Sequence, residues 1–441
     1  MVTALLEVDI LDGPVRGVVY ALGVVALVAL LVRAPTRSWL TAAAVAAVGG
    51  GAVAVLLWLV CVRWLDLFGG SLGRAAYLWL AATCAAVAVA AVSLFRVRWW
   101  RRIVATSAVV VFLCCGVLGI NAAFGVNRTV GNLLNIVVPH PLRLAPPAAH
   151  GTTPAVADLW ARWRPPAGMP EAGETGTADI PPTASGFRAR PAGLYLPPAA
   201  RTANPPALPV VVMLMGQPGN PDPGPIASVL DRFARAHHGL APIVVVADQL
   251  GPGIADTGCV DSRRYGKVYR YLTEDVPAWI RTQLNVTADH RFWAIAGYSN
   301  GGQCALSIGV KRPDLFTSII DVSGEEFPGS TNPKKALADL FGHDQAAYDG
   351  QKPLALLAAR HLPGMTAVFT ASTDDPHYYG VARKLTTAAQ AAGMDATLHA
   401  LPSGGHGRAA LIGGLEAGFG VIYPVVGLSP PGAVAAVPTA G

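Results

Sequence analysis

The chain has 441 residues, of which 52% are hydrophobic and only 14% are charged. This composition is too apolar for an ordinary soluble protein, and the apolar residues gather toward the N-terminus, which predicts a membrane part followed by a globular part. The net charge of +6 forms no basic stripe, so nothing in the sequence indicates a nucleic-acid partner.

Four apolar runs occupy the first part of the chain, at residues 17–32, 39–62, 75–95 and 103–126. Three of them reach the roughly 20 residues that a helix needs to cross about 30 Å of hydrocarbon, and the first is marginal unless earlier residues contribute. None contains an internal charge, and tryptophans lie mostly near their ends, where interfacial anchors belong. We therefore expect residues 1–126 to form a transmembrane domain of four helices, with the bilayer of the cell membrane as its partner.

Arginines between these runs predict how the helices are oriented. Arg33 and Arg37 lie between the first two runs, and a second basic cluster lies between the third and fourth runs (Arg96, Arg98, Arg101 and Arg102). The positive-inside rule places both loops in the cytoplasm, so the globular part is expected to be extracytoplasmic. In an alternative, the first run is a cleaved signal peptide; three further spans and the lack of a clear small-x-small site disfavour it.

The remainder is expected to comprise a Pro/Ala-rich linker at 127–185, a catalytic domain at 186–425 and a disordered tail at 426–441. Runs rich in β-branched residues alternate there with helical patterns. The expected strands are 187–196, 210–215, 243–247, 292–296, 318–322, 366–370 and 396–401, and the expected helices are 227–236, 272–283, one after residue 302, 381–392 and 409–419. The alternation predicts an α/β fold, with a mostly parallel sheet covered by helices on both faces.

Residues 297–301 carry the strongest functional signal. They read Gly-Tyr-Ser-Asn-Gly and lie between a predicted strand and a predicted helix. In that context the Gly-x-Ser-x-Gly pattern predicts a nucleophile elbow, in which Ser299 lies on a strained turn and the helix N-terminus faces any negative charge formed there. The alternative is a plain surface turn, which the flanking strand and helix disfavour.

A serine nucleophile needs a base, because its hydroxyl barely ionises near neutral pH. In this arrangement serine, acid and histidine follow in that order, on loops at the carboxyl ends of strands. His406 lies in a glycine-rich loop after the last predicted strand, and it is the candidate base. His399 lies within a predicted strand, and His343 and His361 lie away from strand ends, which favours structural or surface roles for them.

The acid is expected after the strand at 366–370, where Asp374 and Asp375 precede a proline. Its role would be to hold the imidazole in the correct tautomer and to stabilise the imidazolium cation. Asp375 is favoured because an acid directly before proline at a strand exit is the commoner arrangement, with Asp374 close behind. The aspartate that is not used would cap a turn or helix. Glu325 and Glu326 follow the preceding strand and form a third, less favoured choice.

An oxyanion hole requires two backbone N–H groups. One is expected from Asn300, directly after the nucleophile, and the other from the Gly-Gln-Pro-Gly loop at 216–219. Pro218 has no N–H, so Gln217 is the better candidate. The alternative for this loop is a plain Gly/Pro turn.

Cysteines divide between the two halves of the chain. Those in the apolar runs read as small hydrophobic residues (Cys61, Cys84, Cys114 and Cys115). Cys259 and Cys304 are the only two in the globular half, and in an extracytoplasmic domain an even pair predicts a disulfide.

No spacing typical of zinc and no phosphate-binding glycine loop is present, so neither a metal nor a cofactor is expected.

Residues 216–219, 297–302, 374–376 and 404–406 together resemble the putative-esterase branch of the α/β-hydrolases. That branch includes esterase D-like enzymes and the antigen 85 mycolyltransferases. The resemblance covers roughly 187–420 and not the membrane half. It implies a serine acyl-enzyme mechanism on carboxylic esters, with Ser299, an aspartate and His406 carried over. The mycolyltransferases use glutamate as the acid where this chain has Asp374 and Asp375, which weakens the transferase assignment more than the esterase one.

We therefore expect a membrane-anchored extracytoplasmic serine esterase that acts on lipid or other acyl esters of the cell envelope. An acyltransferase that uses a sugar or lipid hydroxyl as acceptor is the first alternative. The second is a catalytically silent scaffold that binds a lipid or a protein, since a fold does not fix a function.

Overall fold

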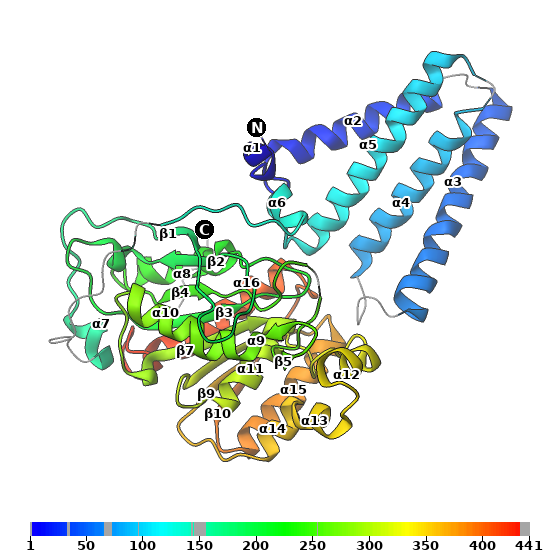
Figure 1. Ribbon diagram of the computed structural model, residues 1–441. Helices are drawn as coiled ribbons and strands as arrows, with labels where there is room; N and C mark the ends of the chain where they lie inside the picture. The colour runs from blue at the N-terminus through cyan, green and yellow to red at the C-terminus, as the bar shows by residue number, and fades with distance from the viewer. Residues whose placement is uncertain are drawn as a thin grey trace. The chain divides into compact units, whose positions relative to one another are not determined.

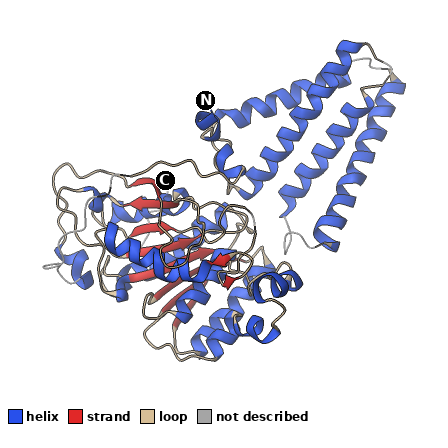
Figure 2. Ribbon diagram, viewed as in Figure 1, coloured by secondary structure: helices blue, strands red, loops and turns tan. Residues whose placement is uncertain are grey.

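The computed structural model describes residues 2–32, 36–65, 73–95, 97–142, 144, 156–253 and 255–432. It comprises two compact units, Met1–Val138 and Pro139–Gly441, each with its own packing. Figure 1 labels their elements, and Figure 2 shows that the strands gather in the second unit whereas the first is helical. The loop residues Arg33 and Arg96 and the last residues of the expected tail, 433–441, lie outside the described residues.

The first unit has four helices that are long and apolar enough to cross a membrane: Pro14–Leu31, Arg37–Trp64, Gly73–Val92 and Trp99–Phe124. They are α2 (Pro14–Leu31), α3 (Arg37–Trp58) with a π-helical continuation (Leu59–Trp64), α4 (Gly73–Val92) and α5 (Trp99–Phe124), flanked by the short helices α1 (Val2–Leu6) and α6 (Val130–Leu133). The four expected apolar runs coincide with these helices to within a few residues.

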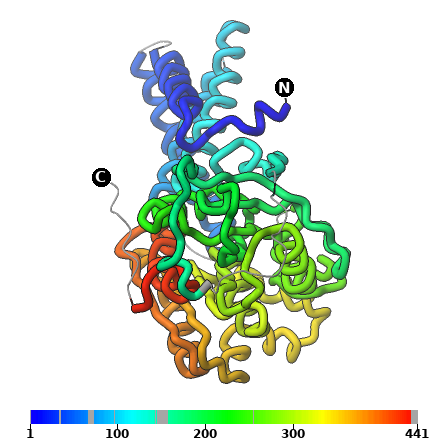
Figure 3. Tube along the Cα trace, turned by 90° about the vertical axis from the view of Figure 1, so that its left-hand side faces the viewer, coloured from blue at the N-terminus to red at the C-terminus, as the bar shows by residue number. Residues whose placement is uncertain are grey.

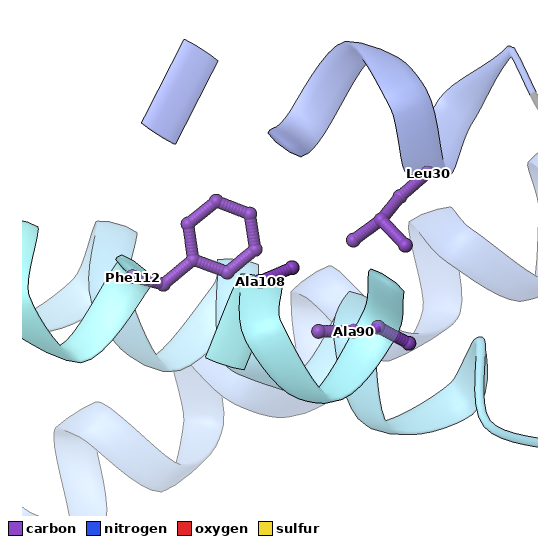
Figure 4. Packing of buried hydrophobic residues seen from close by; sticks show 5 residues of the cluster. Leu30, Ala90, Ala108 and Phe112 are labelled. Carbon is purple, nitrogen blue, oxygen red and sulfur yellow. The ribbon is translucent and has the colours of Figure 1, made fainter. Parts of the chain in front are cut away.

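Small side chains let the helices of the first unit pack closely. Leu30 of α2, Ala90 of α4, and Ala108 and Phe112 of α5 belong to one buried cluster (Figure 4). Between α3 and α4, Gly50 faces the Cys84 carbonyl so closely that an added Cβ would clash with it. Close backbone approach at small residues is how helices associate in a bilayer, where lipid is as apolar as leucine.

The second unit is built on an eight-stranded sheet with the order β1-β2-β4-β3-β7-β8-β9-β10. Its strands are β1 (Glu174–Ala178), β2 (Ala192–Leu196), β3 (Val210–Leu214), β4 (Ile243–Val246), β7 (Trp293–Tyr298), β8 (Ser318–Val322), β9 (Thr366–Ser372) and β10 (Asp395–Leu401). β1 pairs antiparallel with β2, and β2 with β4, while the pairs from β4 through β10 are parallel. A separate ribbon joins β5 (Asp261–Ser262) and β6 (Gly266–Lys267).

Helices cover this sheet, as the continuous apolar runs of its strands require. The main ones are α8 (Gly224–Ala236), α10 (Val276–Gln283) with the preceding α9 (Val268–Arg270) and a π-helical turn (Tyr271–Asp275), α11 (Asn300–Lys311), α15 (Pro376–Ala391) and α16 (Arg408–Val425). α8 packs against α16, and α14 (Pro353–Ala358) packs against both α11 and α15. All positions of β3, β4, β7 and β8 are buried.

The structure differs from the sequence-based expectation at several places. The first strand spans only 192–196, and a further strand, β1, lies inside the expected linker. Val426 and Leu428, expected in a disordered tail, are 1% and 0% exposed. Short helices that the sequence did not predict fill the stretch after β8, namely α12 (Pro333–Phe341), α13 (Gln345–Gly350) and α14. Figure 3 follows this trace through the chain.

Candidate active site

Ser299 lies on the sharp turn between β7 and α11, at φ 57° and ψ −120°. A positive φ is strained for a residue with a side chain, and such strain concentrates at functional sites. An added Cβ at Gly297 would clash with Gly301, and one at Gly301 would clash with the Leu214 carbonyl of β3. Glycine is therefore required at both positions for the strand and the helix to meet. Ser299 lies at the carboxyl edge of the sheet and is 6% exposed as a residue.

His406 approaches this serine from the loop between β10 and α16, with Nε2 2.8 Å from Ser299 Oγ. Gly404 and Gly405 of that loop both have positive φ, at 133° and 53°. Their N–H groups donate to the Asp374 carboxylate at 3.3 and 3.0 Å. Asp374 therefore fixes the backbone of the loop that carries the imidazole.

Two tyrosine rings enclose the His406 imidazole. The Tyr378 ring from α15 stacks on it at 3.8 Å between centroids and 14° between planes. The Tyr298 ring, directly before the nucleophile, stacks at 5.2 Å and 25°. Burial, helped by His377, lowers the pKa of His406 to about 4. Its imidazole is therefore neutral at neutral pH, which is the form that can accept a proton from Ser299.

The two candidate acids occupy different positions around this loop. The Asp375 carboxylate accepts the Tyr378 N–H at 3.4 Å and caps the N-terminus of α15. Burial raises the pKa of Asp375. His406 Nδ1 is buried and has no hydrogen-bond partner among the described residues. The structure thus brings Ser299 and His406 together, but it places neither Asp374 nor Asp375 in a hydrogen bond with Nδ1.

The less favoured glutamates lie elsewhere. Glu326 forms an ion pair with Lys384 of α15 at 2.5 Å. Glu325 is buried behind the elbow, where its N–H donates to the Ser299 carbonyl at 3.2 Å and its carboxylate accepts from Ser330 at 3.2 Å. Burial, with the nearby Asp256, raises the pKa of Glu325 to about 8.

Both expected oxyanion-hole segments flank the nucleophile. Asn300 is the first residue of α11, and N–H groups in a first helical turn have no acceptor within their helix. The 216–219 loop lies against Ser299, since a Cβ added to Gly216 would be 3.4 Å from the Ser299 Cβ. Gln217, the second expected donor, is in this loop and is partly exposed.

The loop at 255–260 is tied to the elbow helix at two points. Cys259 and Cys304 form a disulfide, with an S–S distance of 2.06 Å. Asn300 Nδ2 also donates to Asp256 Oδ1 at 2.9 Å. Burial raises the pKa of Asp256. These ties connect α11, which begins directly after Ser299, to the 255–260 loop.

Sequence reasoning missed the two stacking tyrosines and the hydrogen bond between Asp256 and Asn300. Tyr298 is part of the elbow motif and Tyr378 opens the helix after the candidate acids, but no local pattern marks an aromatic ring as the neighbour of a distant imidazole. Among the described residues, no group of three or more His, Cys, Asp or Glu side chains is arranged to hold a metal ion.

Comparison with known proteins places this unit in a family. The family model described as "Putative esterase" matches residues 187–410, just over half of the chain. An uncharacterized protein of Corynebacterium glutamicum is 35% identical over 241 residues, which cover 52% of this chain and 56% of that protein. S-formylglutathione hydrolase of Paracoccus denitrificans is 23% identical over 197 residues, which cover 41% of this chain and 68% of that enzyme.

Two solved structures are also similar to part of the chain. A ferulic acid esterase superposes with a TM-score of 0.47 at 16% identity, covering 58% of this chain and 99% of its own. An S-formylglutathione hydrolase from Agrobacterium tumefaciens gives 0.46 at 19% identity, covering 59% of this chain and 97% of its own. The chain therefore belongs to the esterase family that the matching model describes, with an α/β-hydrolase fold that follows four long apolar helices.

Proposed function

We propose that the protein is a serine esterase that hydrolyses carboxylic esters through an acyl-enzyme on Ser299. The observation that carries this proposal is the 2.8 Å approach of His406 Nε2 to Ser299 Oγ on a strained strand-to-helix turn. Nucleophile and base within hydrogen-bond reach are the signature of covalent catalysis by serine.

In the first half of the reaction, Ser299 Oγ attacks the ester carbonyl while His406 Nε2 takes its proton. The tetrahedral oxyanion is stabilised by the N–H groups of Asn300 and Gln217. The intermediate collapses, the bond to the alcohol oxygen breaks, and His406 returns the proton to the departing alcohol. Water then attacks the acyl-enzyme with His406 again as base, which releases the carboxylic acid and restores Ser299.

The two tyrosine rings have a role in this cycle. When His406 accepts the proton it becomes a cation, and a cation within about 6 Å of an aromatic ring centroid is stabilised by the ring face. Tyr378 and Tyr298 both meet that distance, at 3.8 and 5.2 Å. Since no described side chain bonds Nδ1, these rings supply the contacts that orient and stabilise the imidazolium here.

The proposal includes anchoring in the cell membrane, an extracytoplasmic catalytic unit and an acyl ester of a lipid or envelope component as substrate. Four long apolar helices support the anchoring. The basic residues between the expected spans support the orientation through the positive-inside rule, and a disulfide is typical of proteins outside the reducing cytoplasm. Reporter fusions in the two basic loops test the topology; extracytoplasmic signal from those loops would contradict it.

A fluorophosphonate probe tests the chemistry directly on the full-length protein. We expect covalent labelling of the wild type and none of Ser299→Ala. Ser403→Ala, an exposed serine in the loop that carries His406, is the matched control and should label normally. Labelling that survives Ser299→Ala would reject the assigned nucleophile, and an unlabelled wild type would favour the silent scaffold.

Product analysis then separates hydrolysis from acyl transfer. The full-length enzyme is given esters of graded acyl length with and without an added alcohol. Free acid as the product in both cases supports the esterase. A new ester that forms at the expense of the acid would instead support the acyltransferase.

A further inference from the structure

A groove of about 840 Å³ runs between α3 and α4 in the first unit. Its walls are mostly small and aliphatic, and they include Ala54 of α3, and Leu78 and Ala81 of α4. Trp58 and Tyr77 also line it, and their rings meet edge to face at 6.4 Å between centroids. Arg63 and Arg74 complete the lining.

The charged residues lie at one end of this groove. Arg63 is in the π-helical continuation of α3, and Arg74 is the second residue of α4. From Gly51, at the other end, to Arg63 is about 18 Å along a helix at roughly 1.5 Å per residue. Half of a hydrocarbon core is about 15 Å thick. The groove is therefore long enough to span one leaflet, which would place its two guanidinium groups at the level of the lipid head groups.

Charge complementarity indicates what occupies it. In the part of the chain that the structure describes, no carboxylate forms an ion pair with Arg63 or Arg74. Under the proposed topology both lie on the extracytoplasmic side, where the positive-inside bias does not account for arginine. Guanidinium groups bind phosphate oxygens in bidentate fashion, and basic pockets between membrane helices hold anionic head groups.

We propose that this groove binds one anionic phospholipid, with its phosphate against Arg63 and Arg74 and an acyl chain along the apolar walls. Trp58 and Tyr77 flank the chain near the interface, where amphipathic rings are stable. The site is built by the first unit alone and does not depend on the esterase chemistry. It assigns a specific lipid contact to helices that otherwise appear only as an anchor.

The test uses full-length protein in detergent micelles, with native mass spectrometry to count bound lipids. The probe is an equimolar mixture of dioleoyl phosphatidylglycerol and dioleoyl phosphatidylcholine. We expect the wild type to retain one phosphatidylglycerol with at least about fivefold preference, and the double variant Arg63→Gln/Arg74→Gln to lose that preference. The matched control Arg101→Gln/Arg102→Gln removes the same charge from the first turn of α5 and should keep it.

A second variant tests the groove itself. Ala81→Trp fills the apolar wall while both arginines remain, and it should reduce retention of phosphatidylglycerol severalfold. Unchanged preference in the Arg63/Arg74 variant, equal loss in the control, or full retention by Ala81→Trp would each overturn the proposal. Helix content by circular dichroism checks that every variant is folded. Fluorophosphonate labelling of Ser299 should be unaffected throughout, so failure here is distinguishable from failure of the esterase proposal.

Discussion

The two units use apolar residues in opposite ways. In the helical unit, Val48 and Leu78 are 75% and 71% exposed, whereas in the sheet of the second unit Leu194 and Val212 are 0% and 1% exposed. Side chains of the same kind thus face outward in one unit and inward in the other. A helix satisfies all its backbone polar groups internally and can present apolar side chains to lipid. The sheet instead buries them away from water, which is the main source of its stability.

Glycines also have different structural roles in the two units. Gly50 lets α3 and α4 approach each other, while Gly301 lets α11 meet β3 beneath the nucleophile. The first kind of contact joins two regular helices, and the second builds one irregular turn. The comparison indicates that catalysis depends on a few positions in the second unit, and the following predictions test that dependence from the largest expected effect to the smallest.

His406→Ala should lower kcat/KM by about 10⁴-fold or more, because serine and its base act as one unit. The control is His399→Ala, which removes a partly exposed histidine from β10 and should leave the rate within about twofold. Steady-state kinetics on an ester substrate, with circular dichroism for folding, decide the result. A near-normal rate for His406→Ala would show that another group is the base.

Gly301→Ala should destabilise the second unit by about 3 kcal/mol or more, since the new methyl group meets backbone carbonyls that cannot move aside. Gly380→Ala in α15 has nothing within 4 Å of the new Cβ, and it should stabilise by up to about 1 kcal/mol through helix propensity. Denaturant unfolding followed by tryptophan fluorescence measures both. Equal stability of the two variants would contradict the tight approach described at the elbow.

Loss of the Cys259–Cys304 disulfide should destabilise the second unit by up to about 4 kcal/mol, from a chain closure of 45 residues. Cys259→Ser/Cys304→Ser should therefore melt earlier, and reductant should shift the wild type but not this variant. The control pair Cys61→Ser/Cys114→Ser alters free cysteines of the helical unit. Differential scanning calorimetry with and without reductant should show that the control behaves like the wild type.

Tyr378→Leu should lower kcat/KM by about tenfold, because it removes a ring face from the imidazolium, a contact worth roughly 0.5–2 kcal/mol. It also exposes His406, whose lowered pKa is due mainly to burial. The acid limb of the kcat/KM profile should therefore move from about pH 4 toward the ordinary histidine value of about 6.5. Tyr378→Phe keeps the ring and should change neither quantity. A limb that stays in place in Tyr378→Leu would mean that this ring does not bury the base.

The pH dependence of stability should show opposing contributions. Burial lowers the pKa of His406 to about 4 in the folded state, so its contribution is present above about pH 6.5 and is lost as the pH falls toward 4. Burial raises the pKa of Asp321 to about 7 and of Glu325 to about 8. Their contributions are complete below about pH 4 and are lost as the pH rises through those values.

His406→Gln isolates the smaller of these effects. Between pH 6.5 and 4 the unfolding free energy of the wild type should fall relative to that of the variant. The His406 imidazole is neutral when folded but takes up a proton once unfolding exposes it, and this proton uptake favours the unfolded state of the wild type only. Urea denaturation at several pH values measures the difference. A constant difference across this range would contradict the lowered pKa.

Much of the fold could be predicted because burial leaves a pattern in the sequence. β8 occupies the expected range 318–322, where Ile319, Ile320 and Val322 are β-branched, and the four apolar helices lie where the hydropathy placed them. β1 has the sequence Glu-Thr-Gly-Thr-Ala, lies at the edge of the sheet and is only partly buried, so it has no such pattern. The helices α12 to α14 are short, with few apolar positions to set a period.

The candidate site could likewise be predicted only in part. Chain order and strand ends indicated Ser299 and His406, because topology fixes which loops meet at the carboxyl edge of a sheet. The partners of Asp374 and Asp375 depend on side-chain rotamers and on the exact path of the histidine loop. No local pattern encodes those, and neither the loop contact of Asp374 nor the ring of Tyr378 over the imidazole could be inferred from spacing.

The Asp374 carboxylate accepts hydrogen bonds from two main-chain N–H groups, Gly404 and Gly405, in the loop that carries His406. Replacing Asp374 would remove these hydrogen bonds and would leave the His406 loop less well fixed, even if the carboxylate does not contact the imidazole. A lower turnover number in Asp374→Asn would therefore resemble the loss of a triad acid, although its cause would be displacement of the loop that carries His406. A carboxylate that orients the imidazole and one that supports the loop can be distinguished by the tautomer of His406, for example by ¹⁵N NMR, and not by rates alone.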